Sequence, residues 1–231
     1  MTSVTERLSV VEVQAAARAL LAGVYRPASW SLRAGDTPAL VIGCQGGAGA
    51  TTVALALATA AGPSRLIECC TAAESGLVAA GYSELGEQGP GWLVSERDRL
   101  RLERRAPTGD DRPDASAPLP GAGDPVTVVI DAGHDLPALR RSGWLRPVWD
   151  AAPVVLVTRA SVPGLRRLEA TLADLEPTVG RLAAVVIGPP RKRWPKDLTY
   201  TLGRRTRDLD DDGGLLAAVE DELRRRRFGE V

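Results

Sequence analysis

Lysine is scarce in this sequence. Among 29 basic residues only Lys192 and Lys196 are lysine, and both lie in the last quarter of the chain. A site in the first three quarters that needs a permanent side-chain cation must therefore use arginine or do without one. Aromatic residues make up only 4%, and the 29 acidic residues bring the formal net charge to zero. With no excess of positive charge, the chain as a whole has no field that would recruit nucleic acid or an anionic membrane.

Cysteine and long apolar runs are also scarce. The three cysteines are Cys44, Cys69 and Cys70, an odd number with no Cys-x-x-Cys spacing. This pattern excludes a disulfide framework and a zinc site built on cysteine pairs, and it favours reduced thiols. No apolar stretch reaches 18 residues, and the N-terminus lacks the basic-then-apolar pattern of a signal sequence. We therefore expect a cytoplasmic protein without a membrane span.

Glycine, in contrast, is concentrated in one stretch, residues 43–52, with the sequence GCQGGAGATT. The apolar run 39–42 before it predicts a buried strand, and the Ala- and Leu-rich run 53–61 after it predicts a helix. Strand, Gly-rich turn and helix are the context of a phosphate-binding loop. The glycines allow successive backbone N–H groups to turn inward, and the helix N-terminus adds partial positive charge.

This stretch resembles the deviant phosphate loop of the ParA/MinD-type ATPases, K-G-G-x-G-K-[ST]-T. The matching residues are Gly46, Gly47, Gly49, Thr51 and Thr52. The resemblance covers roughly residues 38–227 and implies a site for ATP or ADP with Mg²⁺. The nucleotide-binding residues it implies are Gln45, Gly46, Gly47, Ala48, Gly49, Ala50, Thr51 and Thr52, and it implies that Thr51 also binds the metal.

Both lysines of the family pattern are replaced, one by Gln45 and the other by Ala50. In the family they neutralise the nucleotide phosphates, the first usually across a dimer interface. A charge-assisted contact is worth roughly 1.5–3 kcal/mol, so each loss weakens binding by about 10- to 150-fold. Turnover suffers more, because phosphoryl transfer depends on positioned charge. An arginine is the alternative cation, and Arg65 and Arg159 are the candidates because each flanks an expected strand.

Asp131 follows a β-branched run, residues 126–130, which predicts a second buried parallel strand. A strand-end aspartate followed by Gly133 matches the Walker B pattern, in which the carboxylate holds the hydration shell of Mg²⁺. Glu68, within the run 65–70, lies near the place where the family has a water-positioning aspartate, and an ordinary charged residue near a strand end is at least as good an interpretation. His134, the single histidine, could orient water or be an ordinary surface residue.

The order of apolar runs predicts an α/β fold. Buried strands are expected at 39–42, 65–70, 126–130, 154–158 and 182–187, and helices at 53–61, 136–149 and 161–175, the second of them with a break near Gly143 or Pro147. Residues 77–79 are expected to form a short helix, residues 86–91 a turn, and residues 92–94 and 100–103 a hairpin or edge strand. This alternation predicts one domain, residues 38–231, with a doubly wound, mainly parallel sheet flanked by helices, as in P-loop NTPases. Residues 1–37 are expected to form an N-terminal helix and a linker. Residues 106–124 are expected to form a flexible loop because Pro, Gly and Asp dominate them.

These features favour a non-hydrolysing homologue of ParA/MinD-type ATPases that acts as a cytoplasmic adaptor or regulator, in a plasmid, conjugation or secretion system. The alternative is an active nucleotide hydrolase or kinase that uses an arginine in place of the lysine. A third reading is a scaffold whose nucleotide site is closed by side chains. We expect a protein partner, while the oligomeric state stays open. The basic runs 191–196 and 224–227 are weak candidates for nucleic acid, since the second run complements the dipole of an expected final helix.

Overall fold

The structure is a computed structural model. It describes residues 30–189 except 71–74, 79, 82, 89–90, 108–116, 119–120, 122, 143 and 176–178. The expected N-terminal helix, the first part of the linker, the basic runs and the final helix lie outside the described residues. Much of the expected loop 106–124 also lies outside them, so its flexibility stays a prediction.

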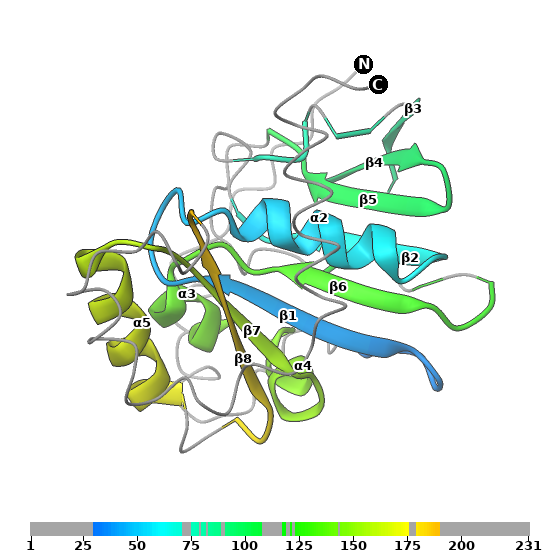
Figure 1. Ribbon diagram of the computed structural model, residues 1–231. Helices are drawn as coiled ribbons and strands as arrows, with labels where there is room; N and C mark the ends of the chain where they lie inside the picture. The colour runs from blue at the N-terminus through cyan, green and yellow to red at the C-terminus, as the bar shows by residue number, and fades with distance from the viewer. Residues whose placement is uncertain are drawn as a thin grey trace, which may run out of the picture.

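One eight-stranded sheet organises the chain, in the order β3-β4-β5-β2-β6-β1-β7-β8 (Figure 1). Its strands are β1 (Thr37–Gly43), β2 (Ser64–Glu68), β3 (Ser83–Glu87), β4 (Trp92–Arg97), β5 (Leu100–Arg105), β6 (Thr127–Asp131), β7 (Val154–Arg159) and β8 (Leu182–Ile187). All neighbouring pairs from β5 to β8 are parallel, whereas β3, β4 and β5 are joined antiparallel. The mainly parallel sheet predicted from the sequence is confirmed.

Helices cover both faces of this sheet. They are α2 (Ala50–Ala60), α3 (Leu136–Arg141), α4 (Arg146–Ala151) and α5 (Val162–Leu175). Strand residues alternate between the faces, as the period of two requires. In β1, for example, Leu40 and Ile42 pack into the cluster that contains α3, α4 and α5 residues, and Val41 packs into the cluster that contains α2. The sheet is therefore sandwiched between two apolar cores, as expected for a doubly wound fold.

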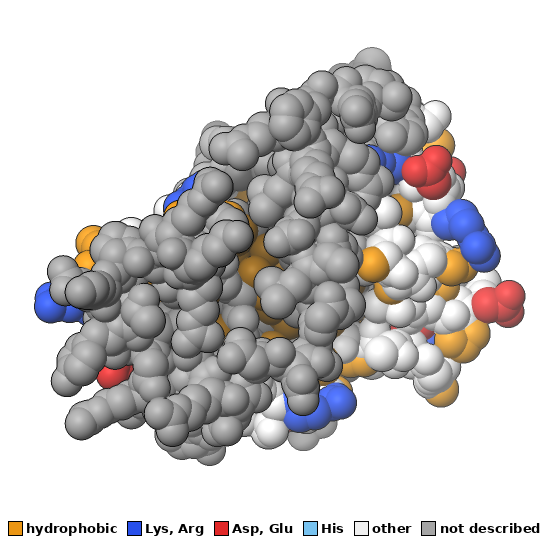
Figure 2. All heavy atoms as spheres, viewed as in Figure 1, with side chains coloured by type: hydrophobic (Ala, Val, Ile, Leu, Met, Phe, Trp, Pro, Cys, Tyr) orange, Lys and Arg blue, Asp and Glu red, His pale blue; other side chains and the backbone are white. Residues whose placement is uncertain are grey.

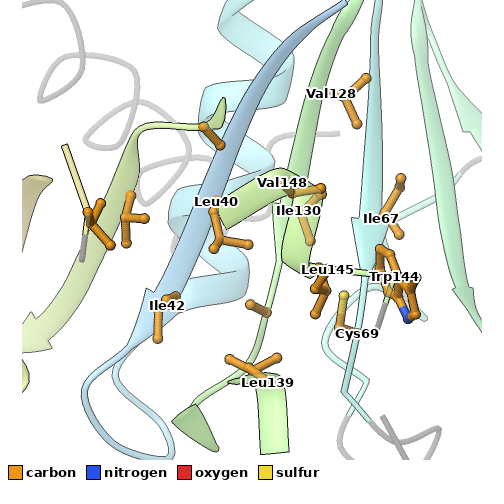
Figure 3. Packing of buried hydrophobic residues seen from close by; sticks show 14 of the residues in the cluster. Leu40, Ile42, Ile67, Cys69, Val128, Ile130, Leu139, Trp144, Leu145 and Val148 are labelled. Atoms are coloured by element: carbon orange, nitrogen blue, oxygen red, sulfur yellow. The ribbon is translucent and has the colours of Figure 1, made fainter. Parts of the chain in front are cut away.

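The core on the α3–α4 side is dense in large side chains. Figure 3 shows Leu40, Ile42, Ile67 and Ile130 directed from the strands toward Leu139, Trp144, Leu145 and Val148. All of these residues are at most 2% exposed. Trp144 also meets Trp30 edge-on, with ring centroids 5.4 Å apart. Packing of this density holds the strand ends, and hence the loops that follow them, in fixed positions.

The antiparallel edge of the sheet contains the main departure from the sequence prediction. The β4–β5 hairpin was expected, but β3 was not, since residues 86–91 had the glycines of a turn. Gly86 has φ 77° and lies where the β3–β4 register shifts, so the glycine forms a bulge within the strand. The short helix expected around residues 77–79 is not seen in the described part of that segment, where Leu77 is buried next to a turn. Among the described residues, no helix is both long and apolar enough to cross a bilayer.

Candidate nucleotide site

The loop between β1 and α2 has the backbone of a phosphate-binding turn. Gly47 has φ 69° and Gly49 has φ 98°, both in the left-handed region that favours glycine. Gly49 is the N-cap of α2, so the loop leads directly into the positive end of the helix dipole. A Cβ at Gly49 would lie 2.6 Å from Ile187 Cδ1, at the end of β8. The conformation of the loop therefore depends on this glycine.

A pocket of about 460 Å³ lies over the loop. It is lined by Gly43 and residues 45–51, by Cys70 after β2, by Asp131, Gly133 and His134 at the end of β6, and by Arg159 at the end of β7. The structure thus brings together the loop residues proposed from the sequence, Gln45 to Thr51, with Asp131. Thr52 is half-buried in the first turn of α2 and does not line the pocket. The pocket lies at the carboxyl ends of adjacent strands, where open α/β sheets bind ligands.

Asp131 has one oxygen without a partner. Its Oδ1 accepts a hydrogen bond from the Gly133 N–H (3.2 Å), whereas Oδ2 is buried and accepts none from the described residues. Burial raises the pKa of this carboxyl group, and the nearby Thr51 hydroxyl and the Gly133 N–H offset the rise only in part. A buried carboxylate oxygen without a donor needs a cation or a water molecule nearby.

The oxygens of Thr51 and Asp131 suit Mg²⁺, which prefers hard oxygen ligands and retains several waters. No group of three or more His, Cys, Asp or Glu side chains in the described parts of the chain could hold a metal alone. The residues present therefore fit a metal that takes its remaining ligands from water and from a bound phosphate. They do not fit a structural metal held by protein alone.

The unpartnered oxygen leads to a prediction for stability. Because the folded-state pKa of Asp131 is raised, its contribution to stability is present at low pH and is lost as pH rises through that pKa. We expect Asp131→Asn to increase the free energy of unfolding by about 1–2 kcal/mol at pH 8 without metal. It should also flatten the decline in stability that accompanies a rise in pH above the ordinary pKa of an aspartate. Urea denaturation at several pH values measures both effects, and a variant less stable than the wild type at pH 8 would contradict this assignment.

Glu68 lies beside Asp131 but does not line the pocket. The two residues are paired in the register of β2 and β6. Glu68 is fully buried and accepts hydrogen bonds from the Gly76 N–H (2.9 Å) and from the Ser75 hydroxyl. Burial raises the pKa of Glu68, and the charge of Asp131 raises it further. Its carboxylate therefore holds the segment after β2, instead of facing the pocket as a water-positioning group would.

Ser75 and Gly76 were not found by sequence reasoning, and they do not line the pocket, but Gly76 packs against a residue that does. A Cβ at Gly76 would lie 2.8 Å from Thr51 Cγ2, so the backbone at Gly76 packs directly on the Thr51 side chain. Only the glycine itself, in an otherwise irregular stretch, could have signalled this close approach. The Thr51 side chain is therefore fixed between α2 and the segment after β2.

The two arginine candidates have different positions. Arg65 is 5% exposed and makes a bidentate contact with Glu103 through Nε and Nη2, both at 2.9 Å. It does not line the pocket. Arg159 does line the pocket, and its Nε donates to the Gly47 carbonyl at 2.8 Å. The structure thus excludes Arg65 as the cation that replaces the loop lysine, whereas Arg159 is in a position to replace it.

A further arginine reaches the loop from α5. Arg167 Nη1 donates to Gln45 Oε1 at 2.9 Å. Gln45 stands where the family pattern has its signature lysine, so a cation is present beside this position although the loop carries none. No sequence signal marked Arg167, because exposed arginines on amphipathic helices are common. His134 is exposed, and a Cβ at Gly46 would lie 3.6 Å from its Nε2.

The cysteines near the site are poor nucleophiles. Cys70 lines the pocket and Cys44 follows β1. Burial raises the pKa of Cys44 to about 11, and burial with the charges of Glu68 and Asp131 raises the pKa of Cys70 further. Thiols are unreactive when protonated. The chemistry of the pocket therefore depends on backbone N–H groups, Thr51, Asp131 and Arg159.

Neither a protein-family model nor a curated protein matches this sequence. Among solved structures, the chain is similar to ParA- and MinD-type ATPases. A ParA family ATPase from Chlorobium tepidum is 12% identical, with a TM-score of 0.47 over 85% of this chain and 94% of that chain. MinD from Pyrococcus horikoshii, in complex with Mg-ADP, is 15% identical, with a TM-score of 0.43 over 72% and 76%. A cobyrinic acid a,c-diamide synthase from Mycobacterium smegmatis is 15% identical, with a TM-score of 0.49 over 84% and 97%.

Proposed function

We propose that this chain binds a nucleoside di- or triphosphate with Mg²⁺ in the pocket over residues 43–52 and does not hydrolyse it. The proposal depends on three features that occur in one pocket. They are a loop built from glycines, an Asp131 oxygen without a partner, and neutral side chains at Gln45 and Ala50. The first two features are what a phosphate chain and its metal require. The neutral side chains leave the transition state without the cations on which phosphoryl transfer depends.

Each residue of the site then has a defined task. The backbone N–H groups of the loop and the N-terminus of α2 bind the phosphates. Thr51 and Asp131 would hold Mg²⁺, which supplies charge neutralisation of the phosphates when it is bound. The segment at Gly76 fixes Thr51 by packing on it. Every one of these groups has a binding or positioning task, and Glu68, the carboxylate nearest to the family's water-positioning aspartate, does not line the pocket.

A protein that binds a nucleotide without hydrolysing it acts through the surface that its nucleotide-bound state offers to partner proteins. We therefore propose a role as an adaptor or regulator with a protein partner, in a plasmid, conjugation or secretion system, in the cytoplasm. Without the cross-interface lysine, we expect no ATP-driven face-to-face dimer. Figure 2 shows Arg, Asp and Glu side chains of both signs scattered over the described part of one face, which does not favour nucleic acid as the partner there.

A second function, a hydrolase or kinase that uses an arginine in place of the lysine, is favoured by one observation, the position of Arg159 in the pocket. Conversion of ATP to ADP distinguishes the two functions, and for a hydrolase it is accompanied by release of inorganic phosphate. The proposed binding protein releases none above background, and the hydrolase releases phosphate at a rate that depends on Asp131.

Calorimetric titration of the full chain with Mg-ATP and Mg-ADP tests the binding itself. We expect saturable binding with one site per chain, weaker without Mg²⁺, and at least about tenfold weaker in Gly49→Ala, because the loop leaves its left-handed conformation. Gly62→Ala is the matched control, since Gly62 has φ 82° at the far end of α2 and open space around it. Its affinity should equal that of the wild type. Equal affinities in both variants would show that the loop is not the binding site.

A further inference from the structure

Arg159 has most of its hydrogen-bonding capacity unused. It ends β7 and is exposed, and its Nε donates to the Gly47 carbonyl. This contact uses one of the five N–H groups of a guanidinium. Among the described residues, its side chain makes no other hydrogen bond and no ion pair with a carboxylate. The bond to Gly47 therefore orients a full positive charge at the edge of the pocket, with its remaining donors available to a ligand.

Arg167 strengthens the same side of the pocket. It lies on α5, the helix that follows β7, and it donates to Gln45 at 2.9 Å. Both arginines lie on the β7–α5 unit, and both contact the first part of the loop, residues 45–47. Neither is paired with a carboxylate among the described residues. The β7–α5 unit thus places two arginine side chains beside residues 45–47 of a loop that has no cationic residue of its own.

From these contacts we infer that Arg159 is the phosphate-binding cation of this site, and that Arg167 is a positioning residue that holds Gln45 at the edge of the pocket. The ligand is a phosphate chain, either that of a nucleotide or free pyrophosphate. The inference rests on the proposed function and adds to it which residue recognises the ligand. The charge of the site comes from a neighbouring strand, not from the loop or from the first turn of α2.

This arrangement agrees with binding without turnover. Arg159 contacts the loop at Gly47, three residues before Ala50, where the family pattern has its phosphate-loop lysine. A guanidinium held at the edge of the loop adds affinity for the phosphates of the bound ligand. Turnover requires charge that is positioned for the transition state. Arg159 would therefore contribute to affinity while the ligand stays intact.

The test compares three variants of the full chain, Arg159→Ala, Arg159→Lys and the control Arg166→Ala, an exposed arginine on α5 outside the pocket lining. Mg-ATP, Mg-ADP, pyrophosphate and adenosine are titrated by calorimetry at several salt concentrations. We expect Arg159→Ala to weaken binding of the three phosphate ligands by roughly 10- to 30-fold and to reduce the salt dependence of their affinity. Arg159→Lys should retain most of the affinity, because the charge remains. Arg166→Ala should bind as the wild type does.

The outcomes separate this inference from the proposed function. If Arg159→Ala binds Mg-ATP as the wild type does while Gly49→Ala binds more weakly, Arg159 is not the phosphate cation, although the proposed function stands. If Arg159→Ala binds the phosphate ligands more weakly but the salt dependence of their affinity is unchanged, Arg159 only stabilises the conformation of the loop. That result also overturns the inference. If the wild type binds none of the phosphate ligands at millimolar concentration, both are wrong. If pyrophosphate binds as tightly as Mg-ATP and its binding is weakened in Arg159→Ala, the phosphate chain alone is the ligand and the role of Arg159 is supported.

Discussion

Replacing Glu103 with alanine should lower the free energy of unfolding by about 3–5 kcal/mol, the cost of breaking a buried ion pair. Glu103 is 1% exposed and lies between two arginines. It accepts two hydrogen bonds from Arg65 at 2.9 Å and one from Arg101 Nε at 2.8 Å. Its removal leaves the Arg65 guanidinium buried without the carboxylate that neutralises it. Urea denaturation at pH 7 measures the loss.

The same antiparallel edge of the sheet provides the control. Glu84 pairs with Arg104 at 3.0 Å, but its side chain is 48% exposed. An exposed pair contributes less than about 1 kcal/mol, so Glu84→Ala should leave stability nearly unchanged. Equal effects of the two substitutions would contradict the assignment of Arg65 to a buried structural pair. Mg-ATP affinity of folded Glu103→Ala should match that of the wild type, because Arg65 does not line the pocket.

Introducing a lysine at the start of α2, by Ala50→Lys, should tighten Mg-ATP binding by about 10- to 150-fold. Ala50 lines the pocket and is the first residue of the helix. A lysine there restores the cation that the family pattern has at this position. The added charge acts next to the phosphates and adds to the helix dipole. Calorimetry at fixed salt measures the gain relative to the wild type.

Ala50→Met is the matched control, because methionine adds a long unbranched side chain without the charge. It should not tighten binding. If lysine and methionine have the same effect, or if lysine yields no gain, the pocket does not hold a phosphate chain. That outcome would favour the reading of the protein as a scaffold whose former nucleotide site is closed.

The sequence alone predicts the parts of this fold that depend on apolar runs and glycine. The expected strand 182–187 agrees with β8, and the expected strands at 39–42 and 154–158 lie within β1 and β7. The positions of the glycine-rich loop 43–52 and of Asp131 were also predictable, because each follows a buried strand directly. In a parallel sheet the carboxyl ends of strands meet at one edge, so these elements had to converge.

Contacts between segments distant in sequence could not be predicted in this way. The pairing of Arg167 with Gln45 spans 122 positions. The pairing of Arg65 with Glu103 depends on the register between β2 and β5, which strand patterns do not define. The sequence could therefore suggest both Arg65 and Arg159 as cations without deciding between them. Only the arrangement of the strands shows that one is part of the core and the other borders the pocket.

The most direct test of the central claim is to incubate the full chain with Mg-ATP and to identify the nucleotide that it holds. The claim is that the loop and Asp131 still bind nucleotide, whereas the neutral residues Gln45 and Ala50 leave it intact. We predict that the bound nucleotide is recovered as ATP, with no phosphate release above the level of Asp131→Ala. Steady phosphate release by the wild type that disappears in Asp131→Ala would contradict the claim and identify the protein as an active hydrolase.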